Sequence, residues 1–188
     1  MDPRSDKHRP LIAAVLGLSA LVAATGLMAA PASAAGSVSE IKLVSSLDEP
    51  RGYCIDMTGS KESASPTSPL QTHSCYDSEG GITVDQGVTT TGIAKGSLRF
   101  PYFGVCVVGA GVKAGGSVTL KSCGTKVTKA VVMSGGMIMP VGSKTLCLTA
   151  GPTSTPGGGG SPVHLKRTLT WETCAAATAD RQTWRVQS

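Results

Sequence analysis

The cysteines constrain the fold of this chain more than any other feature. Three of them follow an aromatic or polar lead-in and precede apolar residues, in RGYCIDM, YFGVCVV and SKTLCLT. Each is followed by an alternation of polar and apolar residues that ends in a further cysteine, in SPLQTHSC, GSVTLKSC and TLTWETC. The third unit closes on DRQTWRV. The chain therefore repeats one unit three times.

The first 34 residues have the features of a secretory signal peptide. Three basic residues open the segment, the apolar run LIAAVLGLSALVAATGLMAA follows, and Ala32-Ser33-Ala34 forms a small-residue cleavage site. We expect cleavage after Ala34, which leaves a single secreted domain of residues 35–188 in the extracellular space or the periplasm. An uncleaved membrane anchor is the alternative, because residues 11–30 could just span a bilayer. No later segment is long and apolar enough to do so.

The repeat also predicts which cysteines are bonded to each other. An even number of cysteines in an exported chain indicates disulfides, and none of these cysteines has the close spacing of a zinc or thioredoxin-type site. Repetition of the pattern favours one disulfide in each unit, namely Cys54–Cys75, Cys106–Cys123 and Cys147–Cys174. Loops of 17 to 27 residues closed in this way would each stabilise the fold by roughly 3 kcal/mol. We predict no metal site and no cofactor.

Short runs rich in Val, Ile, Leu and Thr lie between the breaks in the sequence. Gly, Pro, Ser and Thr interrupt the chain every eight to twelve residues, and helix signals are nearly absent after the leader. Many short strands at this spacing predict an all-β barrel or sandwich. Residues 149–162, TAGPTSTPGGGGSP, predict a long flexible loop that lacks the Gly-Lys-Ser/Thr ending of a phosphate-binding loop.

The charge of the mature chain argues against nucleic acid as a partner. Removing the leader leaves fourteen basic and ten acidic residues, a net charge of +4. A charge this small over a whole domain favours solubility rather than nucleic-acid binding. The one loose basic cluster is Lys121, Lys126 and Lys129. No aromatic residues alternate with these lysines to stack on bases.

The pattern of the three units resembles a known family. Cys-apolar-Asp, then Gln-x-aromatic-x-Cys, then Gln-x-Trp, three times over in an exported chain, is similar to the ricin B-type lectin domain. The first unit has CID, LQTHSC and VDQGV, and the third ends in Gln182-Thr183-Trp184. The resemblance covers residues 41–188 and implies a β-trefoil of about twelve strands. Its repeats would span about residues 41–97, 98–140 and 141–188.

The resemblance implies a sugar-binding pocket in the first unit. In the family, the Asp after the first cysteine accepts hydrogen bonds from two sugar hydroxyls, which carries over to Asp56. The Gln of the second motif lines the pocket and its aromatic residue stacks on the sugar ring, and these places are held by Gln71 and His73. The family's Asn-Gln pair maps to Asp85 and Gln86. Planar acceptors and donors suit sugar hydroxyls, and a ring suits the C–H face.

The other two units depart from this pattern. At the Asp, Gln and aromatic places the second unit has Val108, Thr119 and Lys121. The third unit has Thr149, Thr170 and Glu172 there, with Arg181 at the Asn place. We therefore expect one working pocket at most, in the first unit, and a structural role for the Gln and Trp of the third. Within the first unit, His73 is a smaller and less apolar platform than Trp, and Asp85 adds a second carboxylate.

These features favour a secreted carbohydrate-binding module that is not an enzyme, and the resemblance allows galactose-type or xylose-type ligands. A structural or protein-interaction β-trefoil, inhibitor-like and with decayed pockets, is one alternative. A hydrolase that uses Asp56, Asp77 or Asp85 is the other. Asp77 and Glu79 could suggest a pair of glycosidase carboxylates, but a Gly-flanked acidic turn is the commoner explanation. Neither His73 nor His164 has a Ser or Cys nucleophile placed by a known motif.

Overall fold

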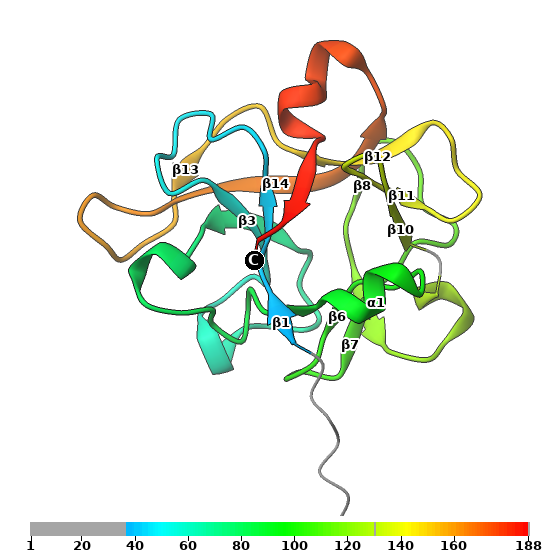
Figure 1. Cartoon of the computed structure of the whole chain (residues 1–188), viewed down its shortest axis with the longest axis horizontal. Coiled ribbons are helices and arrows are strands. Elements are labelled where there is room, and N and C mark those ends of the chain that lie inside the picture. The colour runs from blue at the N-terminus through cyan, green and yellow to red at the C-terminus, as the bar shows by residue number, and fades with distance from the viewer. Residues whose placement is uncertain (1–36, 130, 188) are drawn as a thin grey trace, which may run out of the picture. The chain divides into compact units, whose positions relative to one another are not determined.

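The computed structural model describes residues 37–129 and 131–187, which belong to one compact unit. The predicted signal peptide and its cleavage site lie outside the described residues. The described chain is mostly β-strand with a few short helical turns, which confirms the all-β class (Figure 1). It contains fifteen strands, several of only two residues, where the resemblance implied about twelve.

The elements follow the three units in order. The first unit contains β1 (Val38–Ser39), β2 (Ile41–Leu43), β3 (Tyr53–Asp56), η1 (Lys61–Ser63), β4 (Gln71–Ser74), η2 (Asp77–Glu79), β5 (Val88–Thr89) and α1 (Thr90–Ala94). The second contains β6 (Arg99–Phe100), β7 (Val105–Val107), β8 (Gly116–Ser117), β9 (Leu120–Ser122), η3 (Lys126–Thr128), β10 (Val131–Ser134) and β11 (Met137–Pro140). The third contains β12 (Leu146–Ala150), β13 (Thr155–Pro156), β14 (Leu165–Thr173), η4 (Ala176–Arg181) and β15 (Trp184–Val186).

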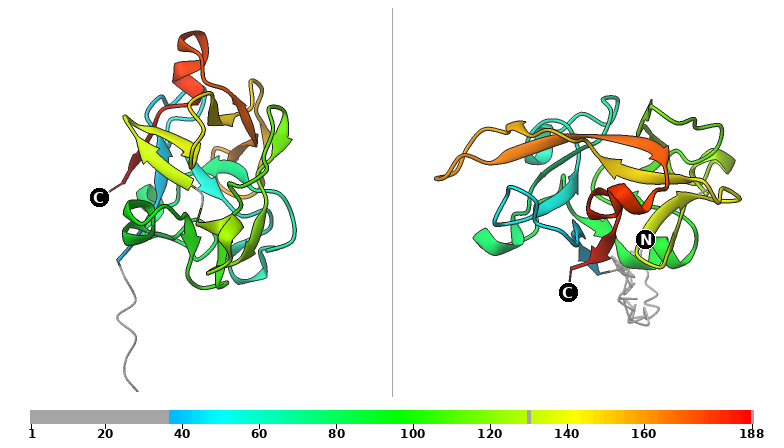
Figure 2. Two further views of the ribbon diagram at one scale, coloured as in Figure 1. Left: turned by 90° about the vertical axis from the view of Figure 1, so that its right-hand side faces the viewer. Right: turned by 90° about the horizontal axis from the view of Figure 1, so that it is seen from above.

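All strand pairs are antiparallel, and they form four sheets. The largest has the order β12-β14-β4-β3-β2-β15, and β13 and β8 also pair with β14. The others are β6-β7-β9, β1-β5 and β10-β11, and no closed barrel is seen in the described residues. The long strand β14, orange in Figure 2, thus carries the third unit into the sheet of the first.

The same hairpin occurs once in each unit. The residue before the first cysteine pairs with the residue before the second, as Tyr53 with Ser74, Val105 with Ser122 and Leu146 with Thr173. Each second cysteine also donates its backbone N–H to the carbonyl two residues before the first, at 3.1, 3.2 and 2.8 Å for Gly52, Gly104 and Thr145. The repeat in the sequence is therefore a repeat in the structure.

The disulfides pair as the repeat predicts. Cys54–Cys75, Cys106–Cys123 and Cys147–Cys174 are bonded, with Cα–Cα distances of 5.0, 5.0 and 5.1 Å. Each bond joins the first strand of the hairpin to the residue that directly follows the second strand. Every unit therefore has its own covalent link, and none of these links connects one unit to another.

The core draws its large side chains from all three units. Tyr53, Phe100, Trp171 and Trp184 are fully buried, together with aliphatic residues that alternate along the strands, such as Ile41 and Leu43 of β2. The indole N–H of Trp184 donates to the carbonyl of Leu148 at 3.0 Å, as a buried indole requires. The structural role expected of this Trp is confirmed.

The disulfides should carry a large part of the stability. In the chain-entropy model, replacing Cys54 and Cys75 together by Ala lowers the free energy of unfolding by about 3 kcal/mol, because the unfolded chain regains the freedom of the loop. The matched pair Cys106→Ala/Cys123→Ala should lose nearly as much, since loop length enters only as a logarithm. Urea unfolding followed by tryptophan fluorescence measures both. A loss below about 1 kcal/mol in either variant would contradict this account.

Candidate functional site

The structure brings Asp56 and Gln71 together. Asp56 ends β3, Gln71 begins β4, and the two residues are opposite each other in the ladder. The side-chain amide of Gln71 donates to Asp56 Oδ2 at 2.8 Å. Asp56 is only 2 % exposed, whereas Gln71 is half-buried. The amide thus stands between the buried acid and the surface.

Asp85 and Gln86 are buried beside this pair, and the side chains of both form hydrogen bonds with backbone groups. Asp85 Oδ2 accepts from the backbone N–H of Lys61 at 2.6 Å, while its Oδ1 is buried without a partner in the described chain. The amide of Gln86 donates to the carbonyl of Ser74 at 3.1 Å, and its oxygen accepts from the N–H of Tyr76 at 3.3 Å. Gln86 therefore bonds to the backbone on both sides of the second cysteine.

Burial disfavours the charged form of the Asp56 carboxyl. Burial raises the pKa of Asp56 well above its usual range, the hydrogen bond from Gln71 opposes this, and the negative charge of Asp85 adds to it. Burial, with the same two carboxylates, also raises the pKa of Tyr76 to about 12. Tyr76 therefore belongs to the group, although it was not predicted. Its place directly after the second cysteine is the one signal in the sequence that points to it.

His73 is brought to the same region, but its ring packs against other protein rings. It is 5 % exposed, stacks on Tyr76 at 5.3 Å between centroids, and meets His164 edge-on at 5.2 Å. Its Nδ1 lies 3.2 Å from the carbonyl of Ser74. In this arrangement the ring is not open to a ligand, in contrast to the platform that the resemblance implies.

The segment that covers His73 is the predicted flexible loop. Its residues 149 and 150 belong to β12, and Thr155–Pro156 forms β13 against β14. Next to the loop, His164 Nε2 lies 3.0 Å from Glu79 Oε1, and Arg51 donates to that same oxygen and to the carbonyl of Pro162. The loop is thus bonded to the first unit through Pro162, while most of its residues, including residues 158–162, are exposed.

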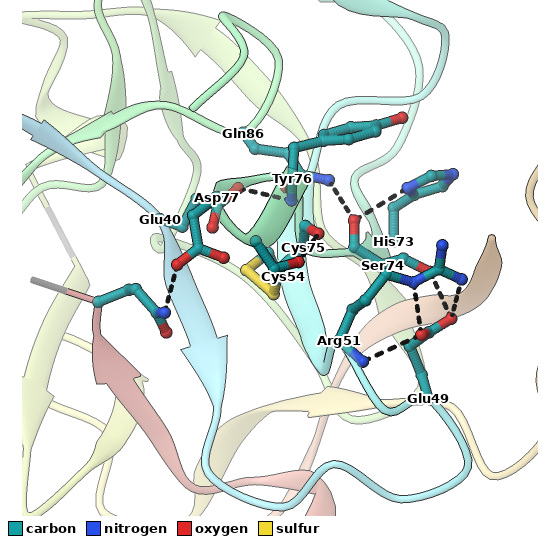
Figure 3. The surroundings of a disulfide bond; sticks show 12 residues. Glu40, Glu49, Arg51, Cys54, His73, Ser74, Cys75, Tyr76, Asp77 and Gln86 are labelled. Carbon is teal, nitrogen blue, oxygen red and sulfur yellow. Dashed lines mark hydrogen bonds and ion pairs between the residues drawn. A yellow bond between two sulfur atoms is a disulfide. The ribbon is translucent and has the colours of Figure 1, made fainter. Parts of the chain in front are cut away.

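Another buried acid, Glu40, lies beside the Cys54–Cys75 disulfide. Glu40 Oε1 accepts from the N–H of Tyr76 at 3.0 Å, and Oε2 is buried without a partner in the described residues (Figure 3). Burial raises the pKa of Glu40 to about 7, and the nearby Asp77 carboxylate adds to the effect. Ligand atoms of Glu40, Cys54 and Cys75 lie within 4.8 Å of one another, but both sulfurs are in the disulfide and offer no thiolate to a metal ion.

Of the five predicted residues, Gln71 alone lines a described hollow. This first hollow has a volume of about 420 Å³. Its lining comprises Thr58, Pro69, Leu70, Gln71, Ser117, Thr155, Lys166, Arg167, Thr168, Leu169 and Thr170. Asp56 reaches it only through the Gln71 amide. The hydrogen-bonding groups that a ligand would meet there are the amide, the hydroxyls and Lys166.

The third unit contains a second hollow, of about 460 Å³, that was not predicted. The residues at the places of the family's pocket all line it, namely Thr149, Thr170, Glu172, Arg181 and Gln182. Gln182 donates to the carbonyl of Thr173 and accepts from the N–H of Ala175, as Gln86 does around Cys75. The positions are thus equivalent, although their side chains differ.

Comparisons with known proteins do not identify the chain. No family model and no curated protein sequence matches it. Within the part of the chain that the structure describes, none of the helices has the length and apolar character needed to cross a membrane.

The buried Glu40 predicts how stability depends on pH. Its folded pKa of about 7 lies above the ordinary 4.5, so folding favours the protonated acid. This contribution is complete below about pH 4.5 and is lost as the pH rises through 7. The Glu40→Gln variant stays uncharged, and its amide can donate to the unpartnered Asp77 Oδ1. We expect it to be more stable than wild type at pH 8 by roughly 2 kcal/mol.

Chemical unfolding at several pH values between 4 and 8 measures this difference. Asp56 acts in the same direction, so the variant should keep a smaller fall in stability with pH. The exposed Glu62 provides the matched control, and Glu62→Gln should retain the full fall of the wild type. An unchanged pH profile in Glu40→Gln would show that Glu40 is already ionised in the folded protein.

Proposed function

We propose that this protein is a secreted carbohydrate-binding module of the ricin B type, built as a β-trefoil, and that it is not an enzyme. The trefoil is supported by the hairpin that recurs with the same register, disulfide and backbone hydrogen bond in all three units. Secretion is supported by the three disulfides, which persist in oxidising compartments.

The observation that carries the binding proposal is the position of Gln71. Its amide lines the first hollow while Asp56 accepts its N–H from the buried side. An amide fixed in this way presents its remaining groups in one orientation, as recognition of sugar hydroxyls requires. Thr58, Ser117 and Thr168 line the same hollow. Recognition in this hollow would thus rest on hydrogen bonds.

A binding role also fits the other first-unit acids better than hydrolysis does. Asp77 accepts from the side chain of Gln187, and Glu79 is bonded to Arg51 and His164. Both carboxylates therefore have structural partners. Asp56 and Asp85 are buried, and neither lines a described hollow.

The burial of the predicted residues favours a second candidate. Asp56, His73, Asp85 and Gln86 are each at most 5 % exposed. If no rearrangement uncovers them, the same fold would serve as a protein-interaction module whose sugar pockets have decayed. The two candidates make opposite predictions for sugar binding.

Binding to immobilised galactose, xylose and polysaccharides, together with titration calorimetry, tests the proposal. We expect weak binding of a monosaccharide, with a dissociation constant of about 1 mM. Gln71→Ala should weaken it at least about tenfold, since about 1.4 kcal/mol of hydrogen bonding disappears. Asp56→Asn keeps the shape of the acid and should also weaken binding, because it changes what holds the amide.

The matched control is Thr119→Ala, at the exposed place in the second unit that corresponds to Gln71. It should bind as the wild type does, and all variants should keep the wild-type circular dichroism. If the wild type binds no sugar, or if Gln71→Ala and Asp56→Asn bind as well as the wild type, the carbohydrate proposal fails. The protein-interaction candidate then takes its place.

A further inference from the structure

The two hollows lie on either side of one strand. Thr168 and Thr170 of β14 line both of them. The first hollow extends over β4 and β8, which pair with one edge of β14, and the second extends over β12 on the other edge. The hollows are therefore two halves of one groove, which we call the β14 groove, with the two threonines between them.

Only short side chains of β14 separate the two hollows, because inward-facing and outward-facing residues alternate along this strand. Arg167, Leu169 and Trp171 are buried on the inner face, which leaves Thr168 and Thr170 on the outer face. Thr170 is opposite Ser117 on one side and Thr149 on the other, so a row of three short hydroxyl side chains crosses the sheet.

The neighbouring row across the sheet, which contains Thr168, also has no large side chain at its centre. Thr168 is opposite Gln71 on one side, and on the other the N–H of Gly151 donates to its carbonyl at 2.8 Å. A Cβ atom at Gly151 would collide with the hydroxyl oxygen of Thr168. The missing side chain at Gly151 therefore makes room for the hydroxyl of Thr168 at this point of the sheet.

The chemistry of the β14 groove is that of a hydroxyl-rich surface. Eight hydroxyl side chains line it, namely Thr58, Ser117, Thr149, Thr155, Thr168, Thr170, Thr173 and Thr178. Gln71 adds an amide to the first half, whereas the amide of Gln182 in the second half is buried and already hydrogen-bonded within the protein. The charged side chains of the lining are Lys166, Arg167, Arg181 and Glu172, and Arg167 is paired with Asp48. Among the described residues, no aromatic side chain lines either half.

These observations limit the ligand. Because no ring is available for stacking, one sugar unit would be held by hydrogen bonds alone, each of which has a small net value in water. A ligand whose units are covalently joined makes the second contact an intramolecular one, at a high effective concentration. The mixture of charges in the groove favours an uncharged chain over a polyanion.

We propose that the β14 groove binds an extended, uncharged polyhydroxylated chain, an oligosaccharide or polysaccharide segment, which crosses β14 with sugar units in both hollows. This inference rests on the proposed function and adds to it the length and direction of the ligand. A peptide added as a further strand does not fit, because β14 is already paired along both edges.

Titration calorimetry with xylose to xylohexaose and galactose to galactotetraose measures how affinity depends on chain length. For the series that binds, we expect affinity to rise at least about 100-fold from the monosaccharide to the tetramer as the second hollow is filled. Ala175→Trp places a ring at the exposed edge of the second hollow and should return the tetramer to within about threefold of the monosaccharide.

Ala177→Trp is the matched control, because Ala177 is exposed in the same region but lines neither hollow. It should leave the length dependence unchanged. If the monosaccharide and the tetramer bind equally, or if Ala175→Trp does not affect the tetramer, the extended groove is overturned while single-site sugar binding remains. If no member of either series binds, the proposed function fails and the inference fails with it.

Discussion

The disulfide-linked hairpin is the constraint on which the rest of this structure depends. A chain with two Phe, three Tyr and two Trp has few large side chains for a core, and its strands are short. Each hairpin is therefore joined twice, by a disulfide and by the backbone hydrogen bond from the second cysteine. As a consequence, the residues two places after each first cysteine take equivalent places in the three units. What each unit can bind is then decided by the side chains at those places.

The first and third units share the same backbone arrangement but have different side chains at equivalent positions. In both, a glutamine bonds to the backbone on either side of the second cysteine, through Gln86 and Gln182. In the first unit the neighbouring places hold Asp56 and Asp85, whose burial must be offset by hydrogen bonds and which lie under other segments. In the third unit the corresponding Thr149 and Arg181 line a hollow, although Thr149 is itself buried and bonded to Gln182.

The sequence predicts contacts within one repeated unit better than contacts between units. The repeated cysteine motifs predict the disulfides and the hairpins, because both partners lie within one unit. The pairing of Asp56 with Gln71 could be predicted for the same reason. The covering of His73 could not, since His164 lies in another unit and nothing near His73 specifies that contact. The sequence did not predict the second hollow, because its residues differ from those that bind sugar in the family. The hollow depends instead on how β12 and η4 pack beside β14.

The walls of the β14 groove are held in place from beneath by one buried cation. Arg167 lies on the inner face of β14, over the ring of Tyr53, and donates to the carbonyl of Gly151 and to Asp48. A hydrogen bond from Ser154, together with Arg167, holds the pKa of Asp48 well below its usual range. In the segment from Gly151 to Thr155, Gly151 and Pro152 line the second hollow and Thr155 lines the first, so these contacts fix the position of both against the first unit. Removal of the cation would take their common partner from Asp48 and from the carbonyl of Gly151, and the hydrogen bond from Ser154 to Asp48 would then be the remaining contact between Asp48 and this segment.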